Sequence, residues 1–287
     1  MTIKKFLIKL WNWFGVMFTT STLEGPFLYF QRVYFLLTFT SLVGIFHTPT
    51  GKKLRAYIER HSDKEAVIKN SLGIFSVNGK NDSLTKSITS FEYGHQAWLD
   101  KASTKNIFLD IGANIGFYSI LALKKYGYSE SYAFEPNPDT FERLSKNVTL
   151  NELMDKVHLI PAGLSDKNST AKLGTKDVHT GASSFVLDGF KHIDHTIDVP
   201  TRTLMSVVGE YNIDAEQISF IKIDVEGYEY PVLLGMKEIF PRLALGTCLF
   251  IEIHPHAKDA EATKTLLAEA GFNCIASTKQ HNFLYQK

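Results

Sequence analysis

"NIFLDIGANIGFYSI", residues 106–120, decides the fold of this 287-residue chain. A short apolar run reaches Asp110, then Gly112 and Gly116 stand four residues apart, and the sequence continues with helical spacing. An apolar run that ends in a glycine turn before a helix is typical of parallel sheets, which bind ligands beyond the carboxyl ends of their strands. Glycines let the backbone approach such a ligand, and the helix amides point at it.

The same alternation of apolar runs and helical segments continues from about residue 105 to the end. Several runs, such as FLDI and FIKID, are apolar on both faces, as strands are when helices cover a mostly parallel sheet. Only a few residues separate the last two runs, so we expect them to pair antiparallel. The predicted strands are 106–111, 131–134, 157–162, 219–224, 248–254, 272–276 and 282–286, and the predicted helices are 115–125, 138–151, 230–240 and 258–270.

The chain is predicted to have three parts. Residues 1–50 form a hydrophobic and amphipathic helical extension, and residues 51–104 form a helical lead-in. Residues 105–287 form the sheet domain, in which residues 166–218 are an insertion of short strands and loops. We expect this insertion to lie near the substrate site.

The first residues, "MTIKKFLIKLWNWFGVMF", have the pattern of a basic amphipathic helix with Trp11 and Trp13. This pattern is typical of a helix at a membrane surface, but a helix packed on its own core or on a second copy of the chain has the same periodicity. The uncharged run 33–46 is too short to span a bilayer, which takes about 20 apolar residues. Three interpretations of residues 1–47 therefore stay open: packing on the chain's own core, homo-oligomerisation and peripheral membrane contact.

Composition excludes some classes of partner and site. The 31 basic and 30 acidic residues give a net charge of +1, so there is no electrostatic basis for a nucleic-acid partner. Cys248 and Cys274 lack the spacing of metal ligands, which excludes a zinc site built on thiolates. Two isolated cysteines in apolar runs fit buried packing residues in a reducing compartment. We expect a cytoplasmic protein, either free or peripheral at the inner face of a membrane.

The second predicted strand ends in "YAFEP", which places Glu135 about 20 residues after the glycine turn, where an acid accepts hydrogen bonds from ribose hydroxyls. The glycine spacing is GxxxG rather than the GxGxxG of dinucleotide sites. Asp110 ahead of the glycines suits a ligand with an amino group more than a bare pyrophosphate. Alone, the glycines could serve packing and the glutamate could cap a helix, but together and in this order they predict a nucleoside site.

The motifs DIGANIGFYS, AFEP, IKIDVEGYE and IEIHP, with AGLSD (162–166) and TGASSF (180–185), resemble the FkbM-type family of class I S-adenosylmethionine-dependent methyltransferases. The resemblance covers about residues 88–287. It implies an α/β, Rossmann-like sheet of seven strands whose last strand is antiparallel, preceded here by the helical extension. It also implies transfer of a methyl group from S-adenosylmethionine to a hydroxyl of a sugar, a glycan or another small metabolite.

The resemblance also implies which residues bind the cofactor. The turn from Asp110 to Gly116 would surround the methionine part, Glu135 would hold the ribose hydroxyls, and Ser165 and Asp166 would lie near the adenine. The full set is Asp110, Gly112, Ala113, Asn114, Gly116, Glu135, Pro136, Ser165, Asp166 and Asp224.

Two further strand ends, DVEG and EIHP, bring Asp224, Glu226, Glu252 and His254 to one rim of the sheet. Methyl transfer needs an aligned acceptor, and a hydroxyl acceptor gains from a general base. His254 is the first candidate because the ordinary pKa of histidine is near working pH. Asp224 is the second, and Glu226 or Glu252 would orient the base. Alternatively, these four side chains hold Mg²⁺ or Mn²⁺, which lowers the pKa of the hydroxyl.

Two other functions compete with this interpretation. A nicotinamide-dependent oxidoreductase could share the sheet, but the missing third glycine argues against it. A non-catalytic membrane-surface or assembly protein could retain a nucleoside-binding fold, but the intact acids at the strand ends argue against that. No motif in the expected acceptor region identifies the acceptor.

Overall fold

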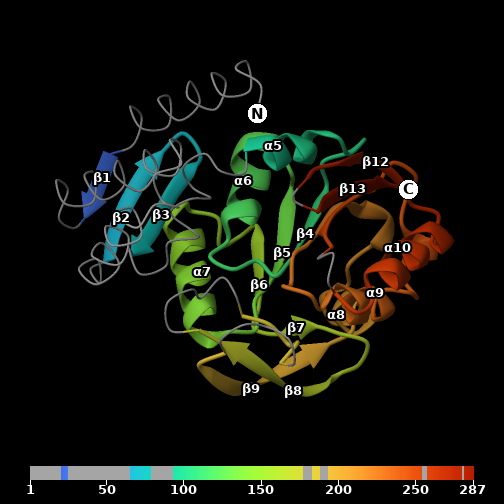
Figure 1. Cartoon of the computed structure of the whole chain (residues 1–287). Coiled ribbons are helices and arrows are strands. Elements are labelled where there is room, and N and C mark those ends of the chain that lie inside the picture. The colour runs from blue at the N-terminus through green and yellow to red at the C-terminus, as the bar shows by residue number, and fades with distance from the viewer. Residues whose placement is uncertain are drawn as a thin grey trace. The chain divides into compact units, whose positions relative to one another are not determined.

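The computed structural model (Figure 1) divides the chain into two compact units, residues 1–93 and 94–287. His254 and most of the predicted N-terminal extension lie outside the described residues, so the interpretations of residues 1–47 stay predictions. No helix within the described ranges is both long and apolar enough to cross a membrane. These ranges are 21–24, 65–78, 93–176, 183–187, 193–253, 257–279 and 281–287.

The first unit contains an antiparallel sheet of β1 (Ser21–Glu24), β2 (Glu65–Asn70) and β3 (Gly73–Asn78). The helical predictions for 1–50 and 51–104 are therefore wrong over these strands. β2 and β3 form a hairpin in which Asn70 Oδ1 accepts a hydrogen bond from the Leu72 amide at 2.9 Å. Gly73, with φ 148°, leaves this turn in a conformation that favours glycine.

The second unit is built on a seven-stranded sheet in the order β12-β13-β11-β10-β4-β5-β6. The five strands from β6 to β11 in this order are parallel, and β13 is antiparallel to both of its neighbours. The predicted sheet with a reversed last strand is therefore confirmed. The strands are β4 (Ile107–Ile111), β5 (Glu130–Phe134), β6 (Val157–Ile160), β10 (Ile218–Ile223), β11 (Cys248–Glu252), β12 (Asn273–Ser277) and β13 (Asn282–Gln286).

Helices connect these strands close to the predicted places. Asn137 caps α7, since its Oδ1 accepts from the Asp139 amide at 3.1 Å, and Pro138 occupies the first turn. The long helices are α6 (Phe117–Tyr126), α7 (Pro138–Leu150) and α10 (Ala260–Glu269), and the shorter ones are α5 (Tyr93–Gln96), η2 (Ala97–Asp100), η4 (Ala215–Gln217), α9 (Glu229–Leu234) and η5 (Phe240–Arg242).

The predicted insertion forms a small sheet and a helix. The sheet has the order β7-β9-β8, with β7 (Gly163–Leu164), β8 (Ser169–Thr175) and β9 (His195–Arg202). α8 (Leu204–Tyr211) follows it, although we expected short strands and loops throughout 166–218. The helix begins there because Thr203 caps it, its Oγ1 accepting from the Ser206 amide at 3.2 Å.

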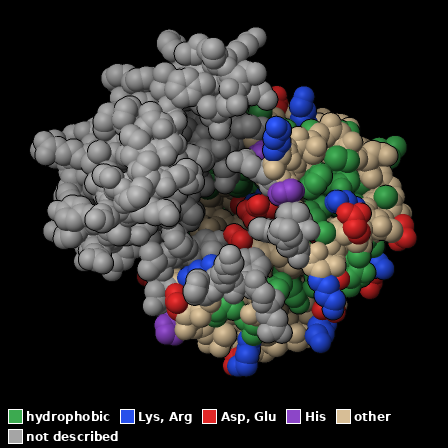
Figure 2. Space-filling model, in the orientation of Figure 1, with side chains coloured by type: hydrophobic (Ala, Val, Ile, Leu, Met, Phe, Trp, Pro, Cys, Tyr) green, Lys and Arg blue, Asp and Glu red, His purple; other side chains and the backbone are tan. Residues whose placement is uncertain are grey.

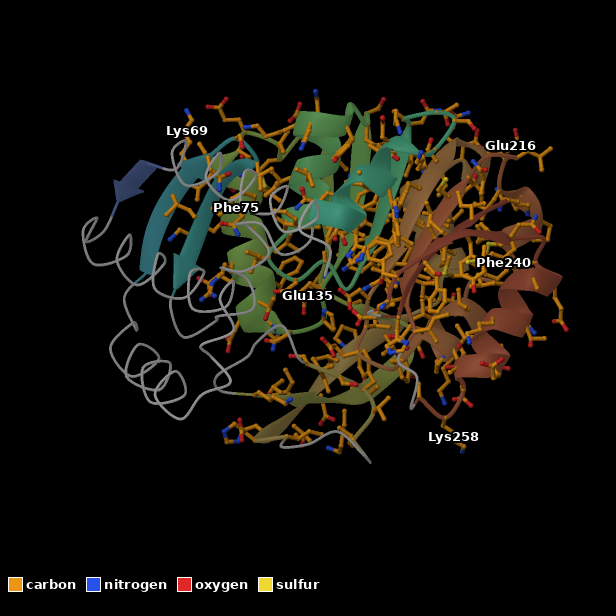
Figure 3. All side chains as sticks on the ribbon, turned by 45° about the horizontal axis from the view of Figure 1, so that its top comes forward. Lys69, Phe75, Glu135, Glu216, Phe240 and Lys258 are labelled. Atoms are coloured by element: carbon orange, nitrogen blue, oxygen red, sulfur yellow. The ribbon has the colours of Figure 1, made fainter. Side chains whose placement is uncertain are left out.

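The two faces of the central sheet carry different side chains because successive residues of a strand alternate. Leu109 and Ile111 belong to the buried cluster formed with α8, α9 and α10, which also contains Phe240 (Figure 3). Phe108 points to the opposite face, where its ring lies 5.8 Å from that of Phe220. Asp110 shares this second face, which determines its contacts below.

The second unit begins earlier than the predicted boundary at residue 105. The rings of His95 and Trp98 lie 5.7 Å and 5.4 Å from the ring of Phe250 on β11. Residues 94–104 therefore pack with the sheet domain rather than with the first unit.

The described surface carries charges of both signs. Lys and Arg side chains are interspersed with Asp and Glu over the described part of the face in Figure 2, in keeping with the near-zero net charge.

The two cysteines differ in burial. Cys248 is buried, as we predicted. Cys274 is exposed, against our prediction, because β12 lies at the edge of the sheet.

We predict that Gly116→Ala destabilises the fold by about 1–3 kcal/mol. Gly116 has φ 83°, and a Cβ there would lie 2.6 Å from Leu144 Cδ1. Urea unfolding followed by circular dichroism measures the change. The control is Gly209→Ala within α8, where a Cβ meets nothing within 4 Å. This control should gain about 0.5–1 kcal/mol, and equal effects of the two substitutions would contradict the prediction.

Candidate active site

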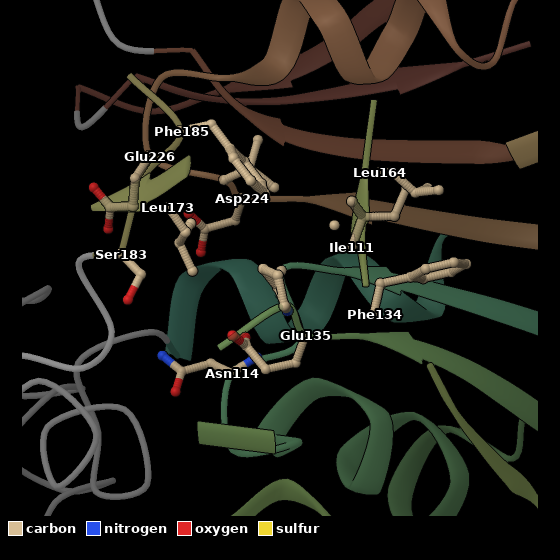
Figure 4. Close-up of a pocket in the computed structure, with 14 residues that line it drawn as sticks. Ile111, Asn114, Phe134, Glu135, Leu164, Leu173, Ser183, Phe185, Asp224 and Glu226 are labelled. Carbon is tan, nitrogen blue, oxygen red and sulfur yellow. The ribbon is translucent and has the colours of Figure 1, made fainter. Parts of the chain in front are cut away.

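A cavity lies at the carboxyl ends of β4, β5 and β10 (Figure 4). The space within it is about 520 Å³ when the part open to solvent is included. Parallel sheets bind ligands at this end, as the opening sequence motif predicts. The wall consists of Ile111, Gly112, Asn114, Phe134, Glu135, Pro136, Gly163, Leu164, Leu173, Ser183, Phe185, Asp224, Val225 and Glu226.

The turn after β4 is pressed against the turns that follow its two neighbouring strands. Gly112 has φ 75°, and a Cβ there would lie 2.0 Å from the Asp224 carbonyl oxygen, so no other residue fits. On the other side, the amides of Gly112 and Ala113 donate to the Phe134 carbonyl at 3.1 and 2.9 Å. Gly112 lines the cavity, whereas Ala113 is buried and does not.

Glu135 stands directly after β5 and lines the cavity with only 6% of its surface exposed. Its two carboxylate oxygens accept hydrogen bonds from the amides of Asn114 (2.9 Å) and Asn137 (3.0 Å). Burial raises the pKa of Glu135 to about 7, and these two amides act in the opposite direction. Asn114 adds an enclosed Oδ1 atom without a hydrogen-bond partner in the described structure. A polar atom of this kind on a cavity wall indicates a place for a ligand donor.

Asp110 does not lie on the cavity wall, so its expected contact with a ligand stays a prediction. It is fully enclosed, and its Oδ2 accepts from the amide (3.0 Å) and the hydroxyl (2.7 Å) of Ser119 in the first turn of α6. The strand period of two directs Asp110 to the face that α6 covers. Gly116 also stands off the wall. It caps the start of α6, where its positive φ and the close Leu144 side chain favour a glycine.

Ser165 and Asp166, expected near an adenine, are not on the described wall. Ser165 is buried, with its Oγ 3.0 Å from Asp166 Oδ1 and 2.9 Å from Tyr228 Oη, and Asp166 is exposed. Gly163 and Phe185 line the cavity instead. The Phe185 ring packs so closely on Gly163 that a Cβ there would lie 2.6 Å from it.

Ser183 and Phe185, at the end of the motif TGASSF, lie on the wall, a position that the motif does not predict. They are held in place from two sides. Ser184 exchanges backbone hydrogen bonds with Gly174 of β8, and its hydroxyl donates to the Glu226 carbonyl at 2.8 Å. Ser183 Oγ accepts from Asn137 Nδ2 at 3.2 Å. A short segment of the insertion thus closes one side of the cavity.

The DVEG turn after β10 adds two acids to the wall, Asp224 and Glu226. Glu226 and Gly227 have φ 54° and 96°, and Glu229 fixes this turn because its Oε1 accepts from the Gly227 amide at 2.9 Å. Burial, together with the negative charge of Asp224, raises the pKa of Glu226 to about 8. Burial likewise raises the pKa of Glu229 to about 7.

The other two residues of the predicted catalytic rim stand apart from this wall. Glu252 ends β11, half-buried and outside the set that lines the cavity, and His254 lies outside the described residues. Within the described ranges, no group of three His, Cys, Asp or Glu side chains could hold a metal ion. The alternative of Mg²⁺ or Mn²⁺ bound with His254 therefore stays a prediction.

The strand order, the reversed last strand and a cavity at the strand ends define a Rossmann-like class I methyltransferase fold. Residues 110–274, more than half of the chain, match the family described as "Methyltransferase FkbM domain". The chain belongs to this family.

The individual relatives have low sequence identity to this chain. Methyltransferase sdnD of Sordaria araneosa is 32% identical over 155 residues, covering 45% of this chain and 60% of that protein. The hexuronic acid methyltransferase AglP of Haloferax volcanii is 28% identical over 176 residues, covering 60% of this chain and 65% of that protein. The chain thus spans less than two thirds of either relative. A solved methyltransferase FkbM from Methylobacillus flagellatus aligns with a TM-score of 0.42 and 17% identity, covering 63% of this chain and 43% of that one.

We predict that Glu226 makes stability depend on pH. Its pKa rises from 4.5 to about 8 on folding, so the folded chain favours the protonated form. This stabilisation is complete below the unfolded pKa and is lost as the pH rises towards the folded pKa. Relative to Glu226→Gln, the wild type should therefore lose free energy of unfolding between about pH 5 and about pH 8.

Urea unfolding of both proteins at the two pH values measures this difference. The control is Glu216→Gln, at an exposed glutamate of η4 away from the cavity. It should keep the pH dependence of the wild type. Identical pH dependence in the wild type and Glu226→Gln would refute the prediction.

Proposed function

We propose that this chain is an S-adenosylmethionine-dependent methyltransferase that acts on a hydroxyl of a sugar, a glycan or another small metabolite. The observation that carries the proposal is the placement of Glu135 and Asp224, from two different strand ends, on the wall of one cavity in a chain of the FkbM family (Figure 4). The side chains of this wall suit the ribose, the amino-acid end and the adenine of the cofactor.

Glu135 suits the ribose, because each carboxylate oxygen that accepts one backbone amide has a further lone pair for a hydroxyl. Asp224 and the backbone of Gly112 suit the amino-acid end. Leu164 and Phe185 give an apolar surface for the adenine. The acids on the wall also favour a positively charged ligand. When bound, S-adenosylmethionine supplies a methyl group activated by a positively charged sulfur.

Glu226 is our candidate for the general base among the described residues. It lies on the same wall as Asp224, and its raised pKa of about 8 makes its carboxylate a stronger base than an ordinary glutamate. As the acceptor oxygen gains the methyl group, Glu226 takes the proton of the hydroxyl. His254, the first candidate from the sequence, is the competing base.

The acceptor class is supported by the relatives. The protein from Haloferax volcanii is named for methylation of a hexuronic acid, which favours an acceptor of the sugar class here. The low identity and the partial coverage make the acceptor of this chain a proposal. Membrane or partner contact through residues 1–47 is likewise proposed on the sequence pattern alone.

We predict that the chain binds S-adenosylhomocysteine in the micromolar range and that Glu135→Ala abolishes this binding, because the ribose loses its acceptor. Isothermal calorimetry measures the affinity. The matched control is Glu130→Ala, since Glu130 begins the same strand at the opposite end, where it pairs with His158 at 3.0 Å. NAD should not bind to the wild type. Unchanged affinity in Glu135→Ala, or preference for NAD, would count against the proposed function.

We predict that Glu226→Gln lowers turnover by about 10²–10⁴-fold while cofactor affinity is retained, since the amide cannot accept the hydroxyl proton. Methyl transfer to sugar hydroxyls, followed by mass spectrometry, measures turnover across pH. His254→Ala is the comparison. If only His254→Ala loses turnover, the base is His254 and the role of Glu226 is excluded.

A further inference from the structure

A lysine stands next to the carboxyl end of β10, a strand whose residues are all buried. Lys222 is only 3% exposed and does not line the cavity. A charge in such a place is expensive unless it is paired, so its contacts reveal what it is for.

The pairing of three parallel strands decides which neighbours Lys222 has. Lys222 is in register with Asp110 on β4 and with Phe250 on β11, so the three side chains share one face of the sheet. The Lys222 ammonium lies 3.5 Å from Asp110 Oδ1 and 5.6 Å from the centre of the Tyr118 ring of α6. An enclosed acid and an aromatic ring therefore hold this lysine against the sheet.

The acid itself cannot shift, because it is anchored on its other side. Asp110 Oδ2 accepts both the amide and the hydroxyl of Ser119, and Ser131 Oγ donates to Ser119 Oγ at 3.0 Å. Asp110 is thus fixed to the first turn of α6 and, through it, to β5. The ammonium of Lys222 has a fixed anchor on the side away from the cavity.

On the cavity side, the same ammonium reaches both turns that form the amino-acid end of the site. It donates to the Gly112 carbonyl at 2.7 Å and lies 3.6 Å from Asp224 Oδ2. Gly112 follows β4 and Asp224 follows β10, and both residues line the cavity. One buried cation therefore orients a carbonyl and a carboxylate on the wall from behind.

We propose that Lys222 is a positioning residue that sets the affinity of the site for the amino-acid end of the cofactor. It acts through the Gly112 carbonyl and the Asp224 carboxylate, not through a contact of its own. The inference rests on the proposed function. It has a distinctive signature, since the adenosine end is held by other residues and should not respond to Lys222.

Two ligands separate the two ends of the site. S-adenosylhomocysteine carries the amino-acid group, whereas 5′-methylthioadenosine has the same adenosine and a thioether without it. Calorimetry with Lys222→Met should show S-adenosylhomocysteine binding weakened by about tenfold or more and 5′-methylthioadenosine binding changed by less than about threefold.

A second variant covers the case in which Lys222→Met does not fold because Asp110 is left as an unpaired buried charge. Lys222→Met/Asp110→Asn removes both charges and should show the same selective loss. The control is Lys264→Met, because Lys264 also pairs with an acid, Glu261 at 2.7 Å, and lies 5.7 Å from the centre of the Phe283 ring. Lys264 is on α10 and does not line the cavity, so neither ligand should respond.

The outcomes distinguish the inference from the proposed function. Equal weakening of both ligands in the double variant means general damage and overturns the role of Lys222. Unchanged S-adenosylhomocysteine affinity in that variant overturns it as well. If the wild type binds neither ligand, the proposed function itself fails, and the inference fails with it.

Discussion

The close approach of two backbone turns, at Gly112 and at Asp224, is the constraint on which the site depends. The turns follow β4 and β10, which pair in parallel at the centre of the sheet, and a Cβ at position 112 would lie 2.0 Å from the opposing carbonyl oxygen. This contact brings the carboxyl ends of β4 and β10 to one wall of the cavity. Because a hydrogen bond from the Asp224 amide to the Ile111 carbonyl (3.2 Å) spans the same point, the strand pairing continues into the site.

Two kinds of feature that cost free energy occur together around the cavity. Asn114 and Glu226 have positive φ angles without being glycines, and Glu135, Glu226 and Glu229 are acids whose pKa values burial raises. Each such backbone conformation costs about 1–3 kcal/mol, so the surrounding structure must hold it in place. The fully buried strands β4 and β10 provide that support. Buried acids and positive φ angles on one cavity wall are typical of functional sites.

The central sheet could be predicted because its strands are apolar on both faces and its helices carry clear start signals, such as Asn137 with Pro138. The hairpin at 65–78 could not, because its turn lacks the Asn-Gly or Asp-Gly pair that is the strongest local signal of a hairpin. α8 was missed for a related reason, since its eight residues are too few to show a helical period against the short strands around it.

In the site, the sequence motifs indicate which strand ends matter but not where their side chains point. Glu135 stands one residue beyond β5 and reaches the cavity, whereas Asp110 lies within β4 and follows the strand alternation into the interior. Because strand side chains alternate, Asp110 shares the face of Phe108, and the sequence alone predicts this direction. The lysine in FIKID was a second available signal, because a charge inside a buried strand requires a partner. The sequence does not indicate that Phe185 and Ser183 line the cavity. They belong to the insertion, whose path to the wall no strand or helix pattern predicts.

The register of β4 and β10 also has an evolutionary consequence. Asp110 and Lys222 face each other across neighbouring strands, and replacing one alone would leave an enclosed charge, which costs about 3–5 kcal/mol. That is a large share of the about 5–15 kcal/mol that keeps a domain folded. Selection should therefore act on the two codons as a unit. Across the family, aspartate and lysine at these places should be kept or exchanged together, and lineages with a lone substitution should be rare.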